Sequence, residues 1–144
     1  MTLNEVLEEW AKDCQIDQSE LGNEAARSPV LHSKYLTLFS QTKINCRIAE
    51  KRVLTAREEL TQYFKGIMTK EQLDEKGWRP FQGKLLKSEI NEKIEAHPLY
   101  MDAIDKLNYY ETLHSDIEGI MREIQNRNFH IKSIQKWKEW VSGA

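Results

Sequence analysis

The chain has 144 residues, of which 40% are hydrophobic and 31% are charged, and its formal net charge at pH 7 is −2. This length predicts a single domain over residues 1–144, and the high charged fraction is typical of a soluble helical protein with much exposed surface. No apolar run approaches the roughly 18 residues of a membrane-spanning helix, and the first residues lack the basic region of a signal peptide, so we expect no membrane association and a cytosolic protein.

The first expected helix follows Thr2, which has the spacing of a capping box with Glu5. A second, short helical stretch is expected from Ser19 to Ser28. Pro29 would then open a long helix, because the missing N–H of proline costs nothing in a first turn.

That long helix, expected over residues 30–65, has the most regular pattern in the chain. Its apolar and small side chains alternate in steps of four and three, which presents one narrow face to other helices. Two of these side chains are alanines, so the face buries little apolar area, and thin cores favour oligomerisation. We call this face the seam: Tyr35, Phe39, Thr42, Cys46, Ala49, Val53, Ala56, Leu60, Tyr63 and Ile67.

A row of positive charge lies beside the seam. Lys43, Arg47 and Lys51, here called the basic stripe, recur every four residues, and Arg52 and Arg57 join them. Residues four apart on a helix lie about 6 Å apart along its axis, so the stripe spans roughly the distance between two phosphates of an extended single strand.

The alternative for these bases is pairing within the protein. The first 24 residues hold seven acids and one base, whereas the next 33 hold seven bases and one acid. Alternating charge blocks of this kind favour contacts between segments or between subunits as readily as contacts with phosphate.

A shorter helix should follow Thr69, which forms a second capping pattern with Gln72. The loop after it places Arg79 between Trp78 and Phe81. Aromatic and cationic side chains together are typical of surfaces that stack unpaired bases, but the usual place of such aromatics is the core, where they would fix the loop.

Ser88 is expected to cap a helix that ends at Ala96, and Pro98 to start a long amphipathic helix. We expect a break at residues 126–128, which would divide a body of residues 1–125 from a last helix over residues 127–144. The apolar side chains of that helix must be buried, either on their own subunit or on a neighbour, which makes them candidates for oligomerisation. They are Phe129, Ile131, Ile134, Trp137 and Val141.

Residues for catalysis are not grouped in any familiar way. The four histidines are widely spaced, the two cysteines have no metal-ligand spacing, and no glycine-rich phosphate loop is present. We therefore expect no enzyme, no metal and no cofactor. Because no β-alternating run occurs either, the predicted fold is an all-α helical bundle that assembles into a homo-oligomer.

Three segments give the chain its resemblance to a known family. They are Glu24-Ala25-Ala26 with residues 31–36, the block at residues 48–53, and the tail from Arg127 to Gln135 with its pattern Arg-x-Phe-x-Ile-Lys-x-Ile-Gln. In these segments the chain resembles the UvsY family, the recombination mediators of T-even-like phages and their marine relatives.

The resemblance implies a ring-shaped, heptameric protein in the cytoplasm of an infected bacterial host. Such a protein would bind single-stranded DNA and load a RecA-like recombinase onto strands covered by single-strand-binding protein. The family's DNA-binding motif, Leu-Lys-Ala-Arg-Leu, matches residues 54–58, where Arg57 is kept but Thr55 and Glu58 depart from it. The proposed DNA-binding residues are therefore Lys43, Arg47, Lys51, Arg52, Arg57 and Arg79. The alternative is a helical scaffold that binds no nucleic acid.

Overall fold

The computed structural model describes residues 1–143 and contains five helices and no strand among them. The helices are α1 (Leu3–Asp13), α2 (Leu21–Phe64), α3 (Lys70–Lys76), α4 (Lys87–Ala96) and α5 (Pro98–Val141). The prediction of an all-α protein is confirmed. The chain divides into two compact units. One combines residues 1–44 with the segment that begins at Glu111, and the other is Asn45–Tyr110. The expected single domain stays a prediction.

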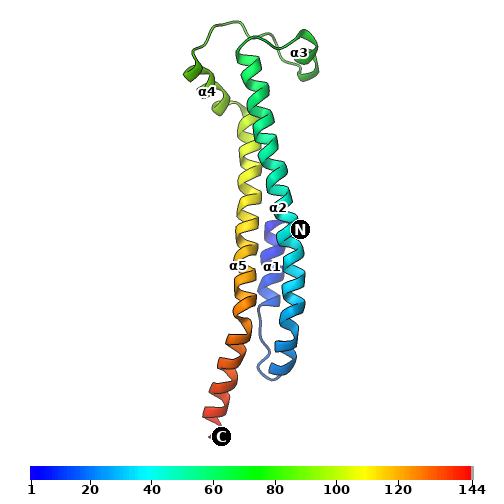
Figure 1. Cartoon of the computed structure of the whole chain (residues 1–144), viewed down its shortest axis with the longest axis vertical. Helices are drawn as coiled ribbons and strands as arrows, with labels where there is room; N and C mark the ends of the chain where they lie inside the picture. The colour runs from blue at the N-terminus through cyan, green and yellow to red at the C-terminus, as the bar shows by residue number, and fades with distance from the viewer. Residues whose placement is uncertain (144) are drawn as a thin grey trace. The chain divides into compact units, whose positions relative to one another are not determined.

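In the first unit, α1 lies beside α2 and α5 (Figure 1). Val6 of α1, Leu31 and Tyr35 of α2, and Leu113 and Ile117 of α5 form one buried cluster, and each is at most 3% exposed. Thr2 caps α1 through the expected box, accepting from the Glu5 backbone N–H while the Glu5 carboxylate accepts from the Thr2 N–H.

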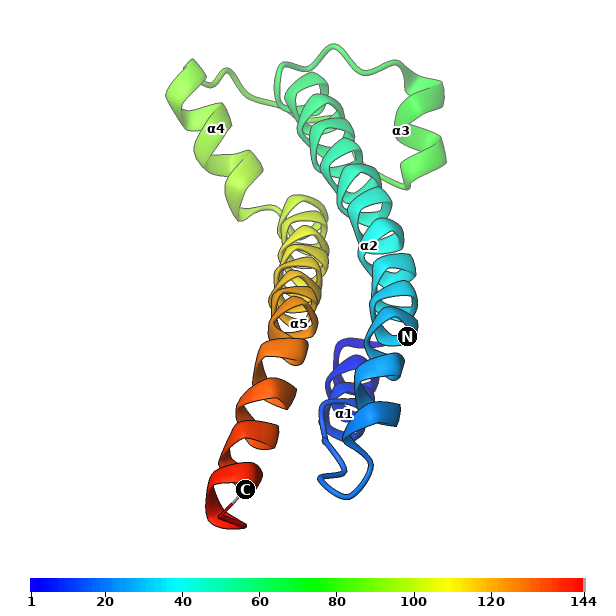
Figure 2. The same cartoon turned by 60° about the horizontal axis from the view of Figure 1, so that its bottom comes forward.

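In the second unit, the end of α2 packs against α4 and the loop before it. Leu60 and Phe64 are buried with Ile90 and Ile94 of α4. Figure 2 shows α4 leading directly into α5, with only His97 between them. Gly66, at φ 72°, follows the end of α2 just beyond the expected last residue, 65, because this left-handed conformation is nearly free of strain only for glycine.

The expected start of α2 at Pro29 was wrong, because the helix begins eight residues earlier, at Leu21. A proline inside a helix removes one backbone hydrogen bond at a cost of about 3 kcal/mol. Tertiary contacts offset it: Ser28 is 6% exposed, and its hydroxyl contacts Arg127 and Asn128 of α5.

The expected break at residues 126–128 was also wrong, since α5 runs without interruption from Pro98 to Val141. Asparagine only weakly disfavours a helix interior, and burial of Arg127 between the helices outweighs that preference. The start of α4 also differs slightly: Leu86 takes the cap position without a side-chain bond, and Ser88 lies inside the first turn.

Candidate nucleic-acid interface

The seam of α2 is covered within the subunit. Nine of its ten side chains are buried or half-buried, and only Ile67, beyond the end of the helix, is exposed at 64%. In the first unit, the Thr42 hydroxyl lies 2.9 Å from Nδ1 of His114 on α5, whose ring stacks on Phe39 at 4.4 Å. The heptad rhythm is therefore explained by packing inside one chain and does not by itself require a second copy.

The basic stripe stays open to solvent. Lys43 in the first unit, and Arg47, Lys51 and Arg52 in the second, are exposed. None of the four forms an ion pair with any residue among 1–143. Exposed cations that form no ion pair within the protein remain available to an external anion.

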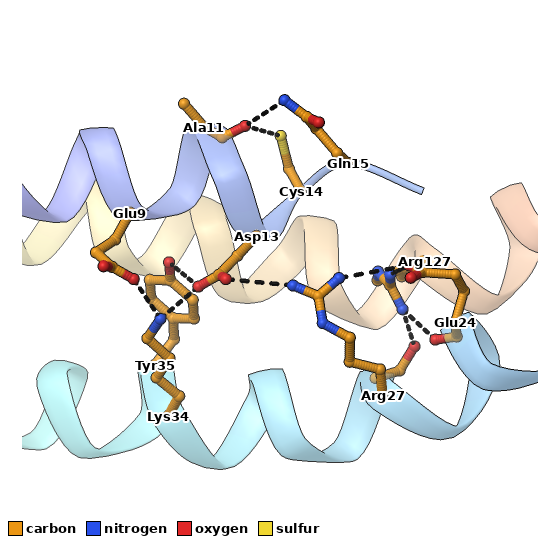
Figure 3. A network of polar contacts seen from close by, with 11 residues as sticks. Glu9, Ala11, Asp13, Cys14, Gln15, Glu24, Arg27, Lys34, Tyr35 and Arg127 are labelled. Carbon is orange, nitrogen blue, oxygen red and sulfur yellow. Dashed lines mark hydrogen bonds and ion pairs between the residues drawn. The ribbon is translucent and has the colours of Figure 1, made fainter. Parts of the chain in front are cut away.

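The acidic N-terminal block pairs with other bases of α2, as Figure 3 shows. Asp13 of α1 forms ion pairs with Arg27 at 3.2 Å and with Lys34 at 2.5 Å. Lys34 also forms an ion pair with Glu9 at 2.6 Å. The alternative that the acids neutralise the basic block thus holds for Arg27 and Lys34, and not for the stripe.

The electrostatics of this cluster follow from its contacts. Burial of the Asp13 carboxyl raises its pKa, but hydrogen bonds from Lys34 and Tyr35 outweigh burial and hold the pKa below its ordinary value. Burial, together with the bond to Asp13, raises the pKa of Tyr35 well above its usual range. Hydrogen bonds to Asp13 and Glu9 raise the pKa of Lys34. Asp13 and Lys34 therefore stay charged at neutral pH, and their ion pair attaches α1 to α2.

Arg127 gives the tail pattern a structural explanation. Its guanidinium is 3% exposed and binds the carboxylate and the backbone carbonyl of Glu24 and the hydroxyl of Ser28 (Figure 3). Glu24 and Arg127 begin two of the three segments that carry the family resemblance. These segments, 103 residues apart in sequence, meet in the first unit.

Arg57, the arginine kept from the family motif, has partners in its own unit. Its guanidinium donates to the Tyr100 hydroxyl at 3.1 Å, lies 5.0 Å from the centre of that ring, and approaches Glu95 at 3.9 Å. Since its side chain is 37% exposed, it reaches solvent while also joining α2 to α5. Its role in DNA binding stays a prediction.

The loop around Arg79 fixes its aromatic side chains in the core. Trp78 and Phe81 pack against the buried cluster of the second unit, which contains Leu60 and Phe64, and their ring centres lie 5.0 and 5.8 Å from that of Tyr63. The Tyr63 hydroxyl also donates to the Arg79 carbonyl at 2.8 Å. Both rings are half-buried against this cluster, which fits the packing alternative, whereas the Arg79 side chain is exposed and its role in DNA binding stays a prediction.

The candidate oligomerisation residues divide into two groups. Ile131 is 5% exposed and Ile134 half-buried, so their contacts lie at least partly within the subunit. Phe129, Trp137 and Val141 are 61–69% exposed, and Trp137 stacks on Trp140 with ring centres 5.3 Å apart. The second group therefore offers most of the apolar surface that these five residues leave for another subunit.

The second unit contains a groove that the sequence did not predict. Its lining residues come from α2 and α5 and include three alanines and two cations: Ala49, Ala56, Ala103, Arg52 and Lys106. We call it the alanine groove. The only signal in the sequence was the small size of the two seam alanines, which predicted a thin core but not an opening.

Two further structural facts bear on function. Residues 1–143 contain no group of three or more His, Cys, Asp or Glu side chains placed to hold a metal ion. Within the same described part of the chain, no helix combines the length and apolar character needed to cross a membrane.

Known proteins share both the sequence pattern and the fold of this chain. Residues 9–144 match the family model described as "Recombination, repair and ssDNA binding protein UvsY". The recombination protein uvsY of Enterobacteria phage T4 is 28% identical over 143 residues, which cover 99% of each chain.

Crystal structures of the bacteriophage T4 recombination mediator protein UvsY match the fold as well. One superposes with a TM-score of 0.84 at 26% identity, covering 99% of this chain and 98% of that one. A second crystal form gives 0.85 at 25% identity, covering 97% and 99%. The sequence, the five-helix fold and the matched structures together show that this chain belongs to the UvsY family.

Proposed function

We propose that this protein is a recombination mediator that binds single-stranded DNA. The observation that supports this most directly is the basic stripe on α2, whose exposed cations have no acidic partner among residues 1–143. Contacts to phosphate do not depend on the base sequence, and a mediator must bind strands of any sequence. The family to which the chain belongs is described by the same activity.

The finer proposal concerns partners. A mediator of this kind would load a RecA-like recombinase onto a strand from which single-strand-binding protein is displaced. This work requires competitive binding and no bond making, in keeping with a structure built of packing and ion pairs.

We also propose that the subunits form a ring, a heptamer by resemblance to the family. The exposed side chains of Phe129, Trp137 and Val141 support this, because large apolar groups grouped near one end of a helix are a common interface signal. Repeating the stripe around a ring would multiply weak contacts through avidity.

The test of DNA binding is a triple variant in which Lys43, Arg47 and Lys51 become alanine. Each lost phosphate contact lowers the slope of log affinity against log salt by about 0.7, so the slope should fall by about 2 for each subunit on the strand. Fluorescence anisotropy with a labelled oligonucleotide measures affinity across the salt series.

A matched control removes three exposed cations elsewhere: Lys12, Lys70 and Arg122. Its slope should stay close to that of the wild type, although its net charge changes equally. Equal slopes for both triple variants would contradict the stripe as the binding surface. No binding by the wild-type protein at about 0.1 M salt would favour the scaffold alternative.

A further inference from the structure

The alanine groove is a site that the basic stripe does not explain. Its volume is about 360 Å³, within the range of about 300–1,000 Å³ common for small-molecule sites. Ala49, Ala56, Leu99 and Ala103 supply its apolar lining. All of these residues belong to the second unit, so the groove is complete within it.

The groove exists because three methyl side chains stand where larger ones would close the space. Ala49 and Ala56 are seam positions one heptad apart on α2, and Ala103 lies on α5. Leucine or isoleucine at such positions would interdigitate and fill the gap between two helices. Elsewhere on these helices larger side chains are fully packed: Leu60 of α2 and Ile117 of α5 are each 0% exposed.

The charges around the groove favour an anionic occupant. Arg52 of α2 and Lys106 of α5 line it, and neither has an ion-pair partner in the described chain. Of its two acids, Glu59 is held by Lys76 at 2.8 Å and Asp102 is exposed. The lining is neutral overall, but because Lys76 from outside the groove pairs with Glu59, it leaves two unpaired cations against the single carboxylate of Asp102. This excess of unpaired cations favours an anionic segment over an uncharged apolar helix.

We propose that the alanine groove receives an unpaired nucleobase of the bound strand, while Arg52 and Lys106 contact the flanking phosphates. The proposal rests on single-stranded DNA binding as proposed above, and deepens it. A base has an apolar face and polar edges: the methyl groups would cover the face, and Thr55 and Asp102 offer hydrogen-bonding groups to an edge. A duplex keeps its bases stacked and paired, so the groove would discriminate in favour of unpaired strands.

The experiment compares two labelled strands of equal length, an oligothymidylate and one made of abasic sites, in fluorescence anisotropy with the full-length protein. Burial of one apolar face of a base against the methyl groups is expected to give the wild type at least about a fivefold preference for the thymidylate strand. Ala103→Leu fills the groove and should bring the two affinities together, leaving the abasic affinity and its salt dependence unchanged.

Two further variants make the result specific. Thr55→Leu covers the groove from an exposed position, so it is expected to lose the preference without disturbing the core. Ala11→Leu places the same added side chain at an exposed position on α1, in the other unit, and should keep the wild-type preference.

Equal binding of both strands by the wild type would overturn the groove proposal and leave the stripe in place. A retained preference in Ala103→Leu and Thr55→Leu would also overturn it. So would a change in assembly mass in these variants with the preference intact, since the groove would then be an interface between copies. No binding of either strand would instead overturn the proposed function, and the groove proposal with it.

Discussion

Arg127 is the most deeply buried charged side chain among residues 1–143. Replacing its partner Glu24 by glutamine tests how much their ion pair contributes to stability. The substitution keeps the shape of the side chain but leaves the Arg127 guanidinium, 3% exposed, without its carboxylate. Removing one member of a buried ion pair typically costs 3–5 kcal/mol, because the other charge stays desolvated and uncompensated. Arg127 keeps its bonds to the Ser28 hydroxyl and the Glu24 carbonyl, so we expect the lower end, about 3 kcal/mol.

A double-mutant cycle measures the pair itself. Arg127→Met replaces the cation by an apolar side chain of similar length, and combined with Glu24→Gln it removes both charges. The double variant should recover much of the loss, giving a coupling of about 2 kcal/mol or more between the two sites. Urea unfolding followed by circular dichroism, at one fixed protein concentration, gives the free energies. A loss below about 1 kcal/mol for Glu24→Gln, or strict additivity in the cycle, would refute the reasoning.

Three further outcomes are expected. Because the folded-state pKa of Asp13 lies below its unfolded value near 3.9, its stabilising contribution is present above that value and is lost as the pH falls through the folded pKa. Asp13→Asn should therefore flatten the acid arm of a pH series of urea midpoints, and an unchanged arm would contradict this. Pro29→Ala restores a backbone hydrogen bond inside α2 and is expected to raise the free energy of unfolding by about 1–3 kcal/mol; a lower midpoint would show that the proline is needed. Replacing Trp137 and Trp140 by serine should lower the mass in analytical ultracentrifugation while helix content is kept, because both are exposed within the subunit; unchanged mass would remove them from the interface.

Local signals predicted the ends of several elements correctly. Thr2 and Thr69 form both expected capping boxes, and Gly66 and Gly77 take the left-handed conformation at the ends of α2 and α3. Caps depend on residues three or four apart, so a sequence contains all the information that they need. The seam was predicted for the same reason, since helical periodicity is also local.

Features that depend on distant residues were predicted less well. Pro29 and the asparagines beside Arg127 favour breaks locally, but contacts across 100 or more residues keep both segments helical. For the candidate site, the sequence identified the stripe cations, but it could not show that Arg57 is engaged by Tyr100 or that Lys106 stands beside the alanine groove. Such pairings arise only when α2 and α5 come together.

The division into units has a consequence for biosynthesis. Asn45–Tyr110 is one unbroken stretch of chain, whereas the other unit needs residues from both ends. As the polypeptide leaves the ribosome, the central stretch has all its contacts available first, while Val6, Leu31 and Tyr35 must wait for Leu113 and Ile117. A nascent chain halted near residue 110 would therefore display the uncovered apolar side chains of Val6, Leu31 and Tyr35, a surface that chaperones and proteases recognise.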